Sequence, residues 1–290
     1  GARQLRLQTP LGLSNPLVFC VGRLPEFCES GAETLVTLPA VVNGQLVPGE
    51  GNRNAYFSRQ AQQYQAADVD RYRFQARRGQ HLIVAASARE LIPYLADAVP
   101  GWFQAVVSLY DVRGRELAYD DDYRFHPDPV LHYEIPTDGE YFIEIRDAIY
   151  RGREDFVYRI ALGELPFVTS IFPLGGPAGA ATTVELKGWN LPVDTLTIDA
   201  VDKAPGLYPL SVRARQQVSN TVPFAVDTVR ECLEQAANNS PENAQAITPP
   251  VIINGRIDQA GSWDVFRFEG RAGDQIAAEP LIAEHCTIDD

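Results

Sequence analysis

The chain has 290 residues, of which 45% are apolar and 22% charged, with a formal net charge of −13 and a sequence pI of about 4.8. This length allows two to three domains, each with its own core. The acidic balance excludes nucleic acids as expected partners, because their phosphates would be repelled, and no apolar run reaches the roughly 18 residues that a membrane-spanning helix needs.

The sequence of the first 22 residues is repeated, with substitutions, later in the chain. The segment that starts at Gly1 matches the segment that starts at Gly206. The aligned pairs include Ser14 with Ser219, Asn15 with Asn220 and Phe19 with Phe224, all at the same offset. A repeat of such long period indicates tandem domains. We therefore expect residues 1–22 to be the last two strands of a domain whose beginning is missing, and the chain to be a piece of a longer polypeptide.

Residues 23–37 are expected to form a linker. Cys20 and Cys28 lie close enough in sequence to form a short-loop disulfide, which would suit an oxidising compartment. Isolated thiols are the alternative. The other two cysteines, Cys232 and Cys286, complete neither a C-x-x-C pair nor a zinc-site spacing.

Residues 38–163 are expected to form a complete β-sandwich. LIVAAS, AVVSLYDV, VLHYEI, YFIEIRD and DFVYRIAL are short runs rich in Val, Ile, Tyr and Phe, and turn signals such as TDG separate them. Evenly spaced strands of this kind are typical of antiparallel sandwiches. The predicted core residues of this module are Phe74, Leu82, Val84, Ile143, Ile145, Tyr158 and Ile160. The fold class predicted for the whole chain is all-β, as tandem antiparallel β-sandwiches.

Two other features interrupt this module. ARELIPYLAD, residues 88–97, favours one interrupted helical turn. A 17-residue insertion at about 51–67, rich in Gln, Asn, Arg and Tyr, is absent from the second copy of the module. It is predicted to be an exposed loop, with a partner-binding loop as the alternative.

The remaining chain repeats this organisation. Residues 164–228 are expected to form a second, smaller sandwich, and 229–247 a second linker with a helical start. From residue 248 the first sandwich type begins again, since VVNGQLVPGE is echoed by IINGRIDQAG and DVDRYRFQARRGQ by SWDVFRFEGRAGDQ. The domain order is therefore a tail of the smaller type (1–22), a full larger module (38–163), a smaller one that is short or incomplete (164–228) and the start of a second larger one (248–290).

A run of carboxylates supplies the candidate metal site. Asp120, Asp121 and Asp122 follow a strand, and Asp128 comes shortly after. At a turn these oxygens could converge on a hard cation such as Ca²⁺. Asp also caps turns through its own backbone, so turn chemistry is the alternative explanation. No other cofactor is expected.

An aromatic stretch supplies a candidate ligand-binding loop. Tyr94, Trp102 and Phe103 lie in ELIPYLADAVPGWFQAV, where they could stack on a sugar ring or grip a peptide. The alternative, favoured by the apolar residues around them, is that they fold inward and plug the end of the core.

Catalysis is not expected. The four histidines, His81, His126, His132 and His285, belong to no H-E-x-x-H motif, and there is no G-x-S-x-G elbow or activated-cysteine signature.

Two parts of the chain each resemble a known domain family. VVNGQLVPGE, DVDRYRFQARRGQHLIVAA, GRELAYDDD and TDGEYFIEIRD occur in order and together resemble the bacterial pre-peptidase C-terminal (PPC) domain. FVTSIFPLGGPAGAATTVELKGWNL followed by SNTVPFAV resembles an IPT/TIG immunoglobulin-like domain, although Leu196 to Gly206 is short for the usual central strands. In the PPC resemblance, the two-Asp turn within GRELAYDDD is a structural signature. Alternation of such modules resembles large exported bacterial envelope proteins.

The resulting functional prediction is a non-catalytic structural and adhesive scaffold, secreted or in the cell envelope. Its partners would be protein or polysaccharide surfaces, or further copies of itself. Two alternatives stay open. The PPC resemblance implies an accessory polymer- or substrate-binding region of a secreted peptidase or hydrolase, and the repeats also suit a self-assembling surface layer or fibre.

Overall fold

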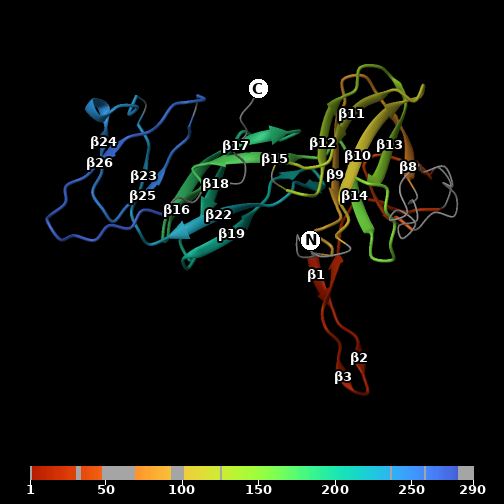
Figure 1. Ribbon diagram of the computed structural model, residues 1–290, viewed down its shortest axis with the longest axis horizontal. Coiled ribbons are helices and arrows are strands. Elements are labelled where there is room, and N and C mark those ends of the chain that lie inside the picture. Colours follow the sequence, from red (N-terminus) through yellow and green to blue (C-terminus); the bar gives the residue numbers. More distant parts are fainter. Residues whose placement is uncertain are drawn as a thin grey trace, which may run out of the picture. The chain divides into compact units, whose positions relative to one another are not determined.

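The computed structural model describes residues 2–30, 34–47, 69–92, 101–124, 126–235, 237–257 and 259–279. The described residues form β-strands and one short 3₁₀ helix, which confirms the all-β prediction (Figure 1). None of the helices among these residues is long and apolar enough to cross a membrane. The chain divides into two compact units, residues 1–165 and 166–290.

The first unit is built around two five-stranded sheets (Figure 1). One sheet has the order β11 (Glu116–Asp120), β10 (Ala105–Asp111), β13 (Gly139–Asp147), β8 (Asp70–Ala76) and β6 (Thr34–Val36). The other has the order β12 (Val130–Glu134), β9 (His81–Ser87), β14 (Val157–Gly163), β7 (Ala40–Gln45) and β5 (Glu26–Cys28).

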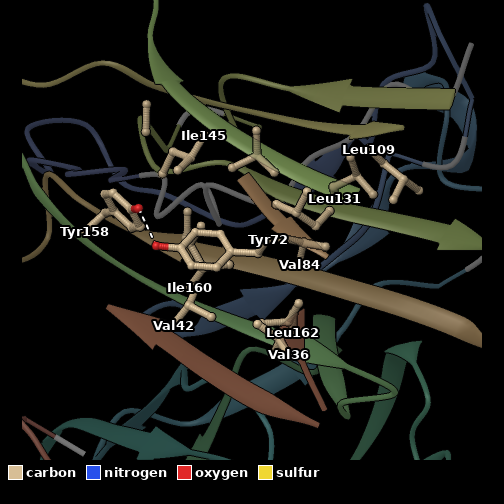
Figure 2. Close-up of a cluster of buried hydrophobic side chains, with 14 of the residues drawn as sticks. Val36, Val42, Tyr72, Val84, Leu109, Leu131, Ile145, Tyr158, Ile160 and Leu162 are labelled. Atoms are coloured by element: carbon tan, nitrogen blue, oxygen red, sulfur yellow. Dashed lines mark hydrogen bonds between the residues drawn. The ribbon is translucent and has the colours of Figure 1, made fainter. Parts of the chain in front are cut away.

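Alternate side chains of both sheets meet in one hydrophobic core (Figure 2). All seven core residues predicted from the sequence are buried, as the period of two along each strand requires. The Tyr72 and Tyr158 hydroxyls lie 2.6 Å apart inside this core, and Tyr158 also donates a hydrogen bond to the Asp70 carboxylate. Burial raises the pKa of both tyrosines, so the pair stays protonated.

The expected linker 23–37 instead contributes an edge strand to each sheet. β5 pairs in parallel with β7, and β6 pairs in parallel with β8. Val36, in β6, is buried in the core. Since three-residue strands show hardly any alternation, their sequence pattern resembles that of a loop.

Before this sandwich, the chain forms a long hairpin. β1 (Ala2–Leu5) pairs antiparallel with β4 (Leu17–Cys20), and β2 (Gln8–Thr9) with β3 (Gly12–Leu13). Cys20 and Cys28 are free thiols, as is Cys232, so the suggested disulfide is not formed. Cys286 lies outside the described residues.

The second unit begins with a smaller two-sheet sandwich. One sheet has the order β15 (Phe167–Phe172), β17 (Ala181–Trp189) and β18 (Thr195–Asp199). The other has the order β16 (Gly175–Pro177), β22 (Val222–Asp227) and β19 (Gly206–Leu210), and a hairpin of β20 (Arg213–Ala214) and β21 (Gln217–Val218) joins its last two strands. Both sheets supply residues to one core, among them Val168, Val184, Leu210 and Phe224.

The rest of this unit holds short strands. β23 (Glu231–Leu233) pairs in parallel with β25 (Ile252–Asn254), and β24 (Gln245–Ala246) pairs in parallel with β26 (Phe266–Arg267). The helical start predicted for the second linker is therefore wrong, because its first residues complete a sheet. The 3₁₀ helix, η2 (Pro241–Asn243), comes later and is capped by Ser240.

Candidate functional site

The carboxylate of Asp128 is buried and binds backbone rather than solvent. It accepts hydrogen bonds from the N–H groups of Ala88, Arg89 and Glu90 at 2.8 to 3.1 Å. These three donors open the single turn that the sequence predicts from residue 88, in which the Leu91 N–H bonds the Ala88 carbonyl. Asp128 thus fixes this turn, as a capping carboxylate does.

The three consecutive aspartates lie at the end of β11. Asp120 accepts a hydrogen bond from the Val130 N–H at 2.7 Å. Burial, followed by the neighbouring carboxylates Asp121 and Asp122, raises the pKa of Asp120 to about 6. Burial also raises the pKa of Asp122. In the described part of the chain, no three His, Cys, Asp or Glu side chains are grouped so as to hold a metal ion. The calcium site stays a prediction from the sequence.

The aromatic stretch is described only from residue 101, and Tyr94 lies outside the described residues. Phe103 points into the core, where its ring stacks on Phe156 with 5.2 Å between centroids. Trp102 is half-buried beneath the guanidinium of Arg89, which lies 4.3 Å from the ring centroid. Phe103 is therefore a core residue, while Trp102 retains some exposed surface.

An ion pair that the sequence did not indicate anchors this aromatic stretch. Asp147 is fully buried at the end of β13 and forms a two-pronged bond with Arg151, both contacts at 2.9 Å. Arg151 also donates to the Trp102 carbonyl at 2.8 Å, and Asp147 accepts from the Gln104 N–H at 3.2 Å. The pair therefore ties the residues around Phe103 to the loop after β13.

In both units, a pair of glutamates three positions apart bonds the chain around an Asn-Gly pair, an arrangement that we call the connector. Glu29 accepts a hydrogen bond from the Gln45 N–H at 3.0 Å, and Glu234 accepts one from the Arg256 N–H at 2.9 Å. A second glutamate lies three positions earlier in each copy and accepts a hydrogen bond from the asparagine of the Asn-Gly pair. Asn43 donates to Glu26 in the first copy, and Asn254 donates to Glu231 in the second. The E-x-x-E spacing in both linkers is a sequence signal that could have revealed these strands.

The glycine after the asparagine lies close to a neighbouring side chain in both copies of the connector. In the first copy, a Cβ at Gly44 would overlap the hydroxyl of Tyr158, which is held by Tyr72 and Asp70. In the second copy, a Cβ at Gly255 would lie 2.6 Å from the Glu234 carboxylate. The Asn-Gly echo in the sequence thus reports close approach rather than a turn.

The N-terminal hairpin has the same geometry as part of the smaller sandwich. Leu5 pairs with Leu17 as Leu210 pairs with Val222, and the rest of β1–β4 follows the register of β19–β22. The Leu7 N–H donates to the Ser14 hydroxyl at 2.9 Å, and the Val212 N–H donates to the Ser219 hydroxyl at the same distance. The sequence repeat is therefore also a repeat of hydrogen bonds.

The hairpin and its counterpart in the smaller sandwich differ in how far their apolar side chains are buried. Phe224 is 1% exposed in the core of the smaller sandwich, whereas its counterpart Phe19 is 57% exposed. The same contrast holds for a set of side chains that we call the hairpin apolar face: Leu5, Leu7, Leu17, Phe19 and Val21. Their counterparts are buried against β15 and β17. The hairpin therefore presents a core-type surface to solvent.

In the smaller sandwich, an asparagine fastens the strand pair β19–β22 to the opposite sheet, which begins with β15. The Asn220 side chain accepts from the Val168 N–H at 2.7 Å and donates to the Val168 carbonyl at 2.9 Å, which fastens it to β15. Asn15 occupies the matching position in the hairpin and is exposed.

Comparisons with known proteins give no family assignment. No family model matches the chain, and no curated protein matches it. The pre-peptidase C-terminal domain of collagenase from Bacillus anthracis is similar at 11% identity and a TM-score of 0.28, covering 49% of this chain and 99% of that one. PliG, a periplasmic inhibitor of g-type lysozyme, is similar at 15% identity in Aeromonas hydrophila and 18% in Salmonella Typhimurium, each covering 46% of this chain and 98% of that one with a TM-score of 0.26. At such TM-scores a likeness carries no argument about function, which has to be inferred from the chain's own residues.

Proposed function

We propose that the chain is a non-catalytic scaffold segment of a larger extracellular or cell-envelope protein, built from alternating PPC-like and TIG-like sandwiches. The observation that carries this proposal is the repetition, in the same order, of the hairpin register and of the connector hydrogen bonds. Repeated modules with the same connector are typical of proteins whose task is to span distance and present surfaces.

The connector of the second unit supports a stiff junction between the modules that it joins. In the second unit, β22 ends at Asp227 and β23 begins at Glu231, so only three residues separate the two modules. One of them is fixed by a bond from the Val229 N–H to the Asp227 carboxylate at 2.9 Å. Asn254 also accepts from the Leu174 N–H at 2.9 Å, which ties the connector back to the smaller sandwich. Such a junction has little of the freedom of a Gly/Ser-rich linker.

The hairpin apolar face supports the same proposal from the other end. A β-hairpin alone is at best marginally stable in water, and a large apolar face gives it reason to pack. We propose that a half-sandwich of the β15–β17–β18 type covers this face and that Asn15 bonds its first strand. Residues 1–22 would then be the end of a TIG-like domain.

Localisation and partners are inferred from surface chemistry. The net charge of −13 favours solubility and disfavours nucleic acid. We propose that the scaffold is secreted or held in the cell envelope and meets protein or polysaccharide surfaces, or other copies of itself, through loops at the ends of its sandwiches.

The proposal can be tested by completing the hairpin with the chain's own strands. Because Gly206 corresponds to Gly1, residues 166–205 can be joined directly ahead of Gly1 to make an extended chain. Hydrogen exchange at Leu5, Leu17 and Phe19 should slow strongly in the extended chain compared with the 290-residue chain. A version with Val168→Asp and Val184→Asp in the added segment should give no slowing. Equal exchange in the extended and original chains would contradict the repeat architecture.

A further inference from the structure

Two histidines that the fold and the scaffold role leave unexplained meet on one face of the larger sandwich. His81 begins β9, and His132 lies in β12, at the edge of the same sheet. In the register of these strands His81 lies opposite Glu134, so His132 is its diagonal neighbour on the same face. His81 is exposed and His132 half-buried, so the pair is open to solvent.

The two imidazoles face each other through one nitrogen each, at a separation that two ligands of one metal ion would also have. His81 Nδ1 and His132 Nε2 lie 3.3 Å apart, and the ring planes differ by 1°. Two nitrogens at the usual zinc distance of about 2.0–2.1 Å in a tetrahedral site are roughly 3.3 Å from each other. The same separation allows a hydrogen bond when one of the two nitrogens carries hydrogen, so an ion would replace that single proton.

Charge around the pair favours a cation. Burial, and then the proximity of His81, lower the pKa of His132. Glu134 acts in the opposite direction on that pKa and adds a negative charge beside the rings.

We propose that His81 and His132 form a two-imidazole site for a borderline divalent transition metal, such as Zn²⁺ or Ni²⁺. Nitrogen ligands distinguish it from the oxygen-rich calcium site expected at the aspartates. Among the residues that the structure describes, no group of three ligating side chains is available, so two coordination positions remain for water or for a ligand from another molecule. The site would let the scaffold hold a metal, or dock through one, and it does not depend on the repeat architecture.

The test is calorimetric titration of the chelator-treated 290-residue chain with ZnCl₂ and, separately, NiCl₂. All proteins carry His285→Ala, since that residue lies outside the described range. The expected result is one site per chain, weakened by more than about tenfold in both His81→Ala and His132→Ala. The matched control is His126→Ala, which removes an exposed histidine from elsewhere and should leave binding unchanged.

Further measurements separate ligand loss from misfolding. The melting temperature without metal should be similar in all variants, and zinc should raise it only where both His81 and His132 are present. With Cu²⁺, electron paramagnetic resonance should show coupling to two imidazole nitrogens. No saturable binding at millimolar metal, or equal binding in the His81 and His132 variants and the parent, would overturn the proposal.

Discussion

Removing the carboxylate of Asp147 should destabilise the first unit more than almost any other single change. Asp147 is fully buried and accepts hydrogen bonds from two groups of the Arg151 side chain and from the N–H groups of Gln104, Ile149 and Arg151. The Arg151 side chain is only 12% exposed. In Asp147→Ala its charge would stay inside the protein without its carboxylate.

The expected cost reflects this burial. Breaking a buried ion pair by removing one partner costs about 3–5 kcal/mol, because the remaining charge is uncompensated. We expect about 4 kcal/mol for Asp147→Ala, which corresponds to a fall of roughly 10 °C in the melting temperature of a unit of this size. Arg151→Met in the same chain should recover part of the loss, since it removes the orphaned charge.

Differential scanning calorimetry of the 290-residue chain measures this effect, with the transition of the second unit as internal reference. The control is Asp111→Ala, which breaks a pair of the same spacing with Arg115, whose side chain is 75% exposed. Its effect should be a small fraction of that of Asp147→Ala. Equal shifts for both variants, or no recovery with Arg151→Met, would refute the reasoning.

Three further predictions address the core, the pH dependence and calcium. Gly44→Ala should lower the free energy of unfolding of the first unit by about 3 kcal/mol in urea, because the added Cβ would overlap the restrained Tyr158 hydroxyl. Gly255→Ala should cost less, because its added Cβ would contact only the end of the Glu234 side chain. Folding raises the pKa of Asp120 to about 6, so this group should make the free energy of unfolding fall as the pH rises from about 4 to about 6. Asp120→Asn should remove that fall when stability is measured by calorimetry. A pH profile that is the same in the variant and the parent would contradict the assignment. If Ca²⁺ binds at Asp120, Asp121, Asp122 and Asp128, the melting temperature should be higher in millimolar Ca²⁺ than in chelator. The double variant Asp121→Asn with Asp122→Asn should abolish this rise. A parent melting temperature that does not change with Ca²⁺ would leave turn chemistry as the explanation.

The sandwich could be predicted because its strands alternate. Ile143 and Ile145 in β13, or Tyr158 and Ile160 in β14, are two positions apart and bury the same face, which a single sequence displays directly. The edge strands β5 and β6 could not be read this way. Each has three residues and pairs in parallel with a later strand, β5 with β7 and β6 with β8. Only the partner strand identifies such a short strand, and local sequence patterns do not reveal that partner.

The candidate sites show the same limit. The carboxylates of Asp120 and Asp128 were found, but an aspartate beside a turn suits a cation or a backbone N–H equally well, and only the fold places Ala88 to Glu90 against Asp128. His81 and His132 are 51 positions apart and belong to no motif. Only the register of β9 and β12 brings them together.

Whether the hairpin is part of a sandwich of the same type as residues 166–227 is tested most directly by the cost of Phe19→Ala in two backgrounds, with Phe224→Ala as reference. Phe224→Ala removes a buried ring and should cost about 3–5 kcal/mol. Phe19→Ala should cost well under about 1 kcal/mol in the 290-residue chain, where the ring is 57% exposed. In the extended chain that carries residues 166–205 ahead of Gly1, its cost should rise towards that of Phe224→Ala. A cost that stays the same in both backgrounds would contradict a shared sandwich type.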